Sequence, residues 1–317
     1  MTIFLFLLAG LVLLVVGGDA LVRGAERMAL RFGVSPLLIG LTIVGFGTST
    51  PELVTSLQAA FAGAPGISVG NVVGSNIANI LLILGLTALI SPIAVARGSF
   101  RRDAVMLGLS AALCLVIVLS GALGRWAGFV MIAVLAGYLF YCVRSEGLAL
   151  PATPKDVTHD VPAAPGNSLL NIALIIGGLA LTIGGAHLFV RGAISLATGF
   201  GISETIIGLT VVAVGTSLPE LVASLMAAFR RQSDLALGNI VGSNIFNVLF
   251  ILGATAIVHP IPVPAIIAQF DIWIMLAATA ALILAGLVFG RVSRPAGAVL
   301  FTGYCGYTGW LASHAMA

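Results

Sequence analysis

One segment of this chain occurs twice. Residues Gly40–Gly85 and Gly208–Gly253 align without a gap at a constant offset of 168, and 28 of the 46 aligned residues are identical. The identical residues include polar ones in register, which chance similarity between two apolar segments does not produce. The sequence therefore predicts a fold made of two related halves.

The composition excludes whole classes of protein. Of the 317 residues, 60% are hydrophobic and 8% are charged, whereas a soluble domain is about 25% charged. So few charged side chains cannot cover a water-facing surface, which excludes a soluble enzyme. The net charge of +3 is too small and too scattered for a nucleic-acid-binding surface. We expect a polytopic membrane protein whose surroundings are the lipid bilayer.

The apolar runs predict the number of membrane spans. A spanning helix needs about 20 apolar residues, and the chain has room for ten: 2–22, 35–62, 67–90, 103–121, 123–143, 167–190, 203–229, 235–258, 268–289 and 295–313. The Pro-rich polar stretch 144–166 predicts a linker between two five-helix repeats, 1–143 and 167–317. Because five is odd, the repeats must have opposite orientations, which is typical of secondary transporters.

The basic residues predict the orientation. With ten spans, Arg125 and Arg191 lie on one side of the membrane and the other twelve basic residues on the opposite side. Basic loops stay in the cytoplasm, so we expect a cytoplasmic linker and both termini outside the cytoplasm. The twelve residues are Arg23, Arg27, Arg31, Arg97, Arg101, Arg102, Arg144, Lys155, Arg230, Arg231, Arg291 and Arg294.

Two glutamates lie deep inside apolar runs. Glu52 and its repeat mate Glu220 each end the motif Gly-Thr-Ser-x-Pro-Glu, at 47–52 and 215–220. A carboxylate at that depth costs at least about 2.5 kcal/mol. The structural alternative is a proline kink whose glutamate bonds to neighbouring hydroxyls, but two copies in a duplicated chain favour a functional site.

The proline of each motif predicts a broken helix, because it has no N–H and disfavours helical geometry at the residue before it. We expect the backbone carbonyls of Gly45–Thr48 and Ala213–Thr216 to lose their helical partners. Ser49 or Thr50 would cap the second half-helix. Such a break is tolerated in a membrane only where something satisfies the freed groups, and a bound cation would do so.

A polar stripe follows each glutamate. One stripe comprises Asn71, Ser75 and Asn79, at helical positions i, i+4 and i+8, and its mate comprises Asn239, Ser243 and Asn247. Together with the glutamates these residues offer only oxygen ligands, which Ca²⁺ prefers. The motifs contain no His or Cys, which disfavours zinc, copper or iron. The alternative is that Asn and Ser bond neighbouring helices together.

With both motifs present twice, the chain resembles the cation/calcium antiporter superfamily, and within it the prokaryotic sodium/calcium exchanger membrane proteins. The resemblance implies an all-α integral membrane protein with ten transmembrane helices, arranged as two inverted repeats with broken helices at the ion site. It implies an antiporter, not an enzyme, that exchanges Ca²⁺ for Na⁺ across the inner membrane by alternating access. It also implies no prosthetic group and no obligatory protein partner. The metal ligands would come from Glu52, Glu220, Thr48, Ser49, Thr216, Ser217, Ser75, Asn79, Ser243, Asn247, Gly45 and Ala213.

One position departs from the family pattern. Sodium-coupled members often have Asp where this chain has Asn247, opposite Asn79. Two central carboxylates remain, and they would neutralise one Ca²⁺, two Na⁺ or two H⁺. H⁺/Ca²⁺ exchange through the same two glutamates is therefore the alternative function, and we expect lower electrogenicity than with three carboxylates. A cation channel is the rival from another class.

Overall fold

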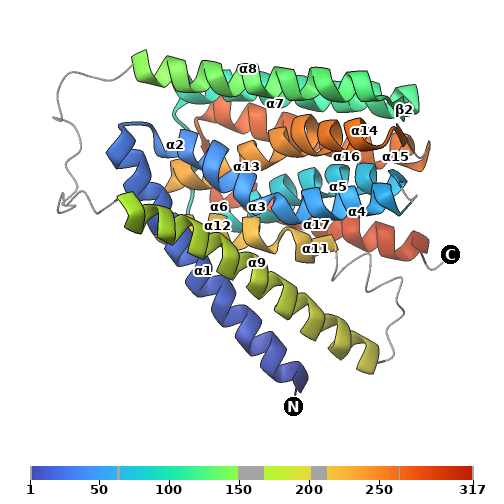
Figure 1. The fold of residues 1–317 in the computed structure, drawn as a ribbon, viewed down its shortest axis with the longest axis horizontal. Coiled ribbons are helices and arrows are strands. Elements are labelled where there is room, and N and C mark those ends of the chain that lie inside the picture. Colours follow the sequence, from blue (N-terminus) through green and yellow to red (C-terminus); the bar gives the residue numbers. More distant parts are fainter. Residues whose placement is uncertain (1, 63–64, 149–167, 201–212, 264, 316–317) are drawn as a thin grey trace.

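The computed structural model describes residues 2–62, 65–148, 168–200, 213–263 and 265–315. Within these ranges the chain is almost entirely helical, and its long helices form a bundle from which one pair diverges (Figure 1). Seven helices are long and apolar enough to cross a membrane, or eight if the bent pair Pro36–Thr48 and Thr50–Phe61 counts as one span. The expected total of ten stays a prediction.

The first half of the chain runs from α1 to α8. Its helices are α1 (Thr2–Phe32), α2 (Pro36–Ile39), η1 (Gly40–Val44), α3 (Gly45–Thr48), α4 (Thr50–Phe61), α5 (Pro65–Ile77), η2 (Ala78–Leu84), α6 (Gly85–Ile90), α7 (Arg97–Ser120) and α8 (Arg125–Leu148). The η segments are π-helical turns, which the sequence did not predict and which often lie at functional sites.

The second half repeats this order. Its described helices are α9 (Ser168–Gly199), α11 (Ala213–Thr216), α12 (Leu218–Phe229), α13 (Ser233–Phe246), η4 (Asn247–Leu252), α14 (Gly253–Val258), α15 (Ala265–Gln269), α16 (Asp271–Leu284), η5 (Ala285–Phe289) and α17 (Arg294–Ala315). The π-helical segments η2 and η4 follow the two polar stripes, so the repeat extends to the local backbone geometry.

Several helix ends differ from expectation. Helix α7 begins at Arg97 rather than near residue 103, and α9 continues past residue 190 to Gly199. Helix α1 continues past residue 22 to Phe32, and an ion pair between Asp19 and Arg23, at i and i+4, supports the helix where the apolar run ends (2.8 Å). Helix α8 ends at Leu148, inside the stretch expected as linker. Most of that linker, 149–166, lies outside the described residues.

Four two-residue strands join the halves. They are β1 (Ile93–Ala94), β2 (Ala122–Leu123), β3 (Ile261–Pro262) and β4 (Arg291–Val292). β1 pairs antiparallel with β4, and β2 with β3. Each pair therefore combines one strand from each half, in a reciprocal pattern.

Helices α1 and α9 lie side by side and diverge from the other helices at one end (Figure 1). Glycines allow their close contact: a Cβ added at Gly10 would lie 2.8 Å from the carbonyl oxygen of Gly185, and one at Gly17 would lie 2.8 Å from that of Gly178. Any larger residue at these positions would push the two helices apart.

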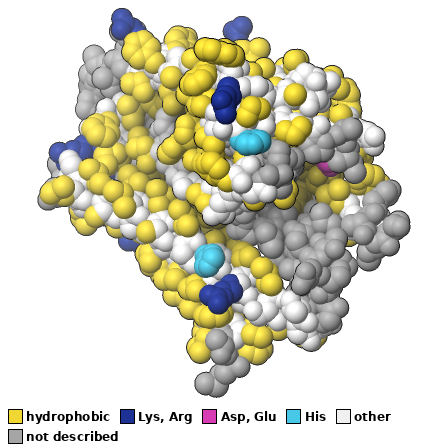
Figure 2. Space-filling view, turned by 45° about the vertical axis from the view of Figure 1, so that its right-hand side comes forward, with side chains coloured by type: hydrophobic (Ala, Val, Ile, Leu, Met, Phe, Trp, Pro, Cys, Tyr) yellow, Lys and Arg dark blue, Asp and Glu magenta, His cyan; other side chains and the backbone are white. Residues whose placement is uncertain are grey.

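The surface is apolar over wide areas. Hydrophobic side chains cover most of the face in Figure 2, and basic side chains are isolated. Large side chains such as Phe4, Leu8, Trp126 and Phe140 are more than 60% exposed. Such a surface suits lipid rather than water. The chain is an integral membrane protein.

Candidate cation site

The two buried glutamates lie at the two helix breaks. Glu52 is in the first turn of α4 and Glu220 in the first turn of α12, and neither is more than 1% exposed. Each accepts a hydrogen bond from the serine at the other half's break. The Oγ of Ser217 donates to the Oε1 of Glu52 (3.0 Å), and the Oγ of Ser49 donates to the Oε1 of Glu220 (2.9 Å).

The second oxygen of each carboxylate is free for a ligand. In the described part of the chain, the Oε2 atoms of Glu52 and Glu220 are buried and have no hydrogen-bond partner. A buried ionised carboxylate is costly unless it is paired. A cation at this point would supply the pairing that the helices do not.

Two asparagines brace the backbone at the glutamates. The Nδ2 of Asn71 donates to the carbonyl oxygen of Glu52 (3.1 Å) and to the Oγ of Ser56 (3.0 Å). Asn239 makes the same two bonds in the other half, to the second glutamate's carbonyl (3.2 Å) and to Ser224 (2.9 Å). These amides thus fix the glutamates' positions through the main chain.

Further amides lie where the π-helical segments begin. The Nδ2 of Asn247 donates to the Oδ1 of Asn76 (2.9 Å), which leaves the Oδ1 of Asn247 buried without a partner among the described residues. The Oδ1 and Nδ2 atoms of its mate Asn79 are likewise unpartnered. Segment η2 contacts α12, and η4 contacts α4, so each amide lies on a segment that packs against the opposite half's glutamate helix.

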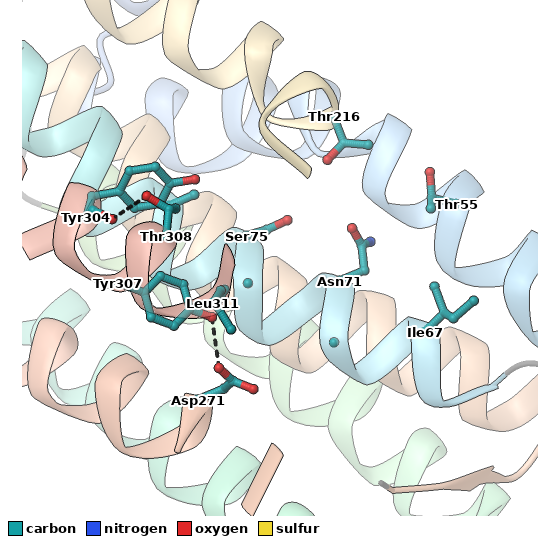
Figure 3. A pocket seen from close by; sticks show the side chains of 13 residues that line it. Thr55, Ile67, Asn71, Ser75, Thr216, Asp271, Tyr304, Tyr307, Thr308 and Leu311 are labelled. Carbon is teal, nitrogen blue, oxygen red and sulfur yellow. Dashed lines mark hydrogen bonds between the residues drawn. The ribbon is translucent and has the colours of Figure 1, made fainter. Parts of the chain in front are cut away.

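A cavity of about 390 Å³ opens beside this site (Figure 3). Thr55 of α4, Asn71 and Ser75 of α5, and Thr216 of α11 line one part of it. The other part is lined by residues from α16 and α17, namely Asp271, Tyr304, Tyr307, Thr308 and Leu311. The cavity thus links the polar stripe of the first half to the last two helices.

The comparison with protein families decides what this chain is. The model of the family described as "Sodium/calcium exchanger protein" matches residues 2–144 and 170–312. The chain belongs to this family.

Individual members are similar along their full length. The chain is 40% identical over 311 residues to the putative antiporter CaxA of Alkalimonas amylolytica, with 96% of each chain covered. It is 34% identical over 338 residues to the sodium/calcium exchanger MaX1 of Methanosarcina acetivorans, covering 96% of this chain and 97% of that one. The solved structure of the sodium-calcium exchanger NCX_Mj, soaked with zero Na⁺ and Ca²⁺, matches with a TM-score of 0.84 and 33% identity, covering 98% and 99%.

The oxygen chemistry of the site suits a hard cation of the kind this exchanger family transports. Carboxylate, hydroxyl and amide oxygens are the ligands that Ca²⁺ takes. No group of three or more His, Cys, Asp or Glu side chains occurs among the described residues. The site therefore offers two carboxylates surrounded by neutral oxygens rather than an acidic cluster.

The helix break differs in detail from the expectation. Ser49 occupies the N-cap position of α4 but makes no side-chain capping bond, since its hydroxyl donates to Glu220. Thr50 is the first residue of α4, and its hydroxyl donates to the carbonyl oxygen of Phe46.

The carbonyl of Gly45 is not freed, since it accepts the N–H of Ser49 (3.1 Å) and a long bond from Ser243 (3.4 Å). The carbonyl deprived of an i+4 donor is that of Gly47, since Pro51 has no N–H.

The other expected ligands lie near the break or on the stripes. Thr48 bonds to Asn239 across the two halves (3.1 Å). Thr216 and Ser75 line the cavity. Ala213 begins α11, and nothing further is described there. That these residues coordinate an ion stays a prediction.

Sequence reasoning missed the serines that hold the asparagine braces. Ser56 and Ser224 occupy the same position in the two repeats, four residues after each glutamate, and both are fully buried. Serine occurs at both positions, which are separated by the repeat offset of 168, and this could have marked the two residues as part of the site. Alone, a serine in an apolar helix more often bonds to its own backbone.

Proposed function

We propose that this protein exchanges Ca²⁺ for Na⁺ across the prokaryotic inner membrane as a secondary antiporter. The observation that carries the proposal is the pair of buried glutamates, each with one oxygen bonded to a serine of the opposite half and one oxygen without a partner. The family membership and the similarity to the sodium/calcium exchangers MaX1 and NCX_Mj support the choice of ions.

The charge of the site sets what can be bound. Two ionised carboxylates are neutralised by one Ca²⁺ or by two monovalent cations, so the two cargoes compete for the same oxygens. An excess of either positive or negative charge inside the membrane is costly. We therefore propose exchange of two Na⁺ for one Ca²⁺, with little net charge moved.

The reciprocal serine bonds support alternating access. Ligands from both halves meet at the glutamates, so a shift of one half against the other changes access to both at once. The architecture we propose is ten spans in two inverted repeats, with both termini outside the cytoplasm and the linker inside it. Pairs of helices in close glycine contact, such as α1 and α9, are suited to sliding as a unit.

A second candidate is H⁺/Ca²⁺ exchange through the same glutamates. Asn247 favours it, because a neutral amide lies where sodium-coupled relatives often have an aspartate. A proton could bind each unpartnered glutamate oxygen in place of a cation.

The test is uptake of radioactive Ca²⁺ into proteoliposomes, with an outward Na⁺ gradient and an outward H⁺ gradient imposed separately. Uptake driven by the Na⁺ gradient alone supports Na⁺/Ca²⁺ exchange, and uptake driven only by the H⁺ gradient supports H⁺/Ca²⁺ exchange. Glu52→Gln is the inactive reference. Glu26→Gln is the matched control, since Glu26 bonds to Gln232 away from the site (2.7 Å) and should transport normally. Uptake that needs no counter-ion and does not saturate would instead indicate a channel.

A further inference from the structure

Asp271 lies in the cavity beside the cation site. It begins α16, and the hydroxyl of Tyr307 donates to its Oδ1 (2.9 Å). Figure 3 shows this bond on the α16–α17 side of the cavity, opposite the stripe that carries Asn71 and Ser75. Among the described residues, Tyr307 is the hydrogen-bond donor to this carboxylate and no basic residue pairs with it.

The repeat provides a comparison. Asp103 is the repeat mate of Asp271, and it accepts a bond from the hydroxyl of Tyr138 (2.8 Å), as Asp271 does from Tyr307. The Nε of Arg102 lies 2.6 Å from Asp103 and neutralises it. In the second half, the position of Arg102 is taken by Phe270.

Phe270 stands where the first half has Arg102, so Asp271 has no arginine next to it in sequence, whereas Asp103 pairs with Arg102. The ring of Phe270 lies against Trp310, with centroids 3.9 Å apart, and stacks on Tyr307. Asp103 is fully buried and Asp271 is partly exposed to the cavity. A carboxylate on the wall of a cleft with apolar sides concentrates cations near it.

We propose that Asp271, with the hydroxyl of Thr308 nearby, forms an outer binding site for hard cations on the route to the two glutamates. The inference deepens the proposed exchange function and rests on it. The cavity supplies the route, because Asp271, Ser75 and Asn71 all line it. Asn71 in turn donates a hydrogen bond to the backbone carbonyl of Glu52. The ligand class is a hydrated mono- or divalent cation with oxygen preference, since carboxylate and hydroxyl oxygens are the groups available.

Terbium(III) luminescence tests this site directly. Tb³⁺ takes the same oxygen ligands as Ca²⁺ and emits when an excited tyrosine or tryptophan lies close to it. In purified Glu52→Gln/Glu220→Gln protein, whose central site is disabled, we expect tyrosine-sensitised emission that Ca²⁺ displaces. Adding Asp271→Asn should weaken Tb³⁺ binding at least about fivefold, because fivefold is the effect that two unit charges have at close range in water and Tb³⁺ carries three. Asp103→Asn, the matched control, should leave it unchanged.

A second variant guards against a folding defect. Tyr307→Phe keeps the charge and frees the bonded oxygen, so it should retain Tb³⁺ binding with an equal or lower midpoint concentration. Equal Tb³⁺ affinity with and without Asp271→Asn in folded protein overturns the inference, as does loss of binding in Tyr307→Phe.

Transport then separates the inference from the proposed function. In otherwise unaltered protein, Asp271→Asn should raise the KM for Ca²⁺ at least about fivefold at low ionic strength, with an unchanged maximal rate. An unchanged KM with intact Na⁺-driven uptake contradicts the outer site while leaving the exchange function standing. Absence of uptake in the unaltered protein contradicts the exchange function, and the Tb³⁺ result then still decides whether the site exists.

Discussion

Ser49 and Glu220 are 171 residues apart in the chain, yet the serine hydroxyl donates a 2.9 Å hydrogen bond to the glutamate carboxylate. Ser217 and Glu52 make the reciprocal bond. Each half of the protein thus completes the carboxylate environment of the other. Neither half supplies the serine bond to its own glutamate, so the site requires the motifs of both halves.

The two serine bonds should contribute equally to ion binding. A hydrogen bond to a charged group is worth about 1.5–3 kcal/mol, so Ser49→Ala and Ser217→Ala should each raise the KM for Ca²⁺ about tenfold or more. Ser195→Ala is the control, because that exposed hydroxyl bonds to its own helix at Arg191. Uptake kinetics in proteoliposomes measure all three. A large effect of one serine and none of the other would contradict the reciprocal arrangement.

The position of the two glutamates at helix breaks could be predicted from the sequence, but the contacts around them could not. Glu52 and Glu220 could be recognised in the sequence because each is a carboxylate inside an apolar run, where an ionised side chain is costly. Ser49 or Thr50 was expected to cap the second half-helix, since capping is a local rule. Ser49 bonds instead to Glu220, because the two breaks face each other only once the halves have packed.

The same limit applies to the asparagines. Asn71 shares a helix face with Ser75 and Asn79, which suggested that all three belong to one ligand stripe. In the structure Asn71 holds the backbone carbonyl of Glu52, while Asn79 keeps both amide atoms unpartnered. Position on a helix face is a property of the sequence, whereas the partner across the interface depends on packing between helices.

Asn247→Asp should make transport more electrogenic. The Oδ1 of Asn247 is buried without a partner among the described residues, so a carboxylate here would add a third negative charge beside the two glutamates. Binding a third Na⁺ would then balance it, and each Ca²⁺ exported would carry net positive charge inward. Current measured on a solid-supported membrane should rise at least about threefold, since a charged group in the membrane requires compensation. An unchanged current would show that charge at this position does not set the coupling.

The contact between Asp19 and Arg230 should restrain helix movement. Arg230 is the C-cap residue that follows α12. It pairs with Asp19 of α1, which also pairs with Arg23 on its own helix. The pair is partly exposed, so it stabilises by about 1 kcal/mol at most. Arg230→Gln should therefore leave the melting temperature nearly unchanged. If α1 slides during exchange, Arg230→Gln should also raise the maximal rate of Ca²⁺ uptake, because it removes a contact that holds α1 to α12. Arg23→Gln breaks a pair within α1 alone, and its maximal rate should match that of the unaltered protein. Equal rates for both variants would contradict a restraint between helices.

The close crossing of α2 and α13 offers a test of packing within the core. A Cβ added at Gly238 would lie 2.3 Å from the backbone oxygen of Leu37. Backbone cannot rotate away, so Gly238→Ala must separate the two helices and should destabilise the fold by about 1–3 kcal/mol. Gly137 of α8 is the control, because it is exposed and no described atom lies within 4 Å of its added Cβ. Gly137→Ala should leave stability equal or slightly higher, since alanine favours a helix over glycine by about 1 kcal/mol. Thermal unfolding in detergent compares the two variants. Equal losses in melting temperature would show that the contact at Gly238 does not limit the stability of the fold.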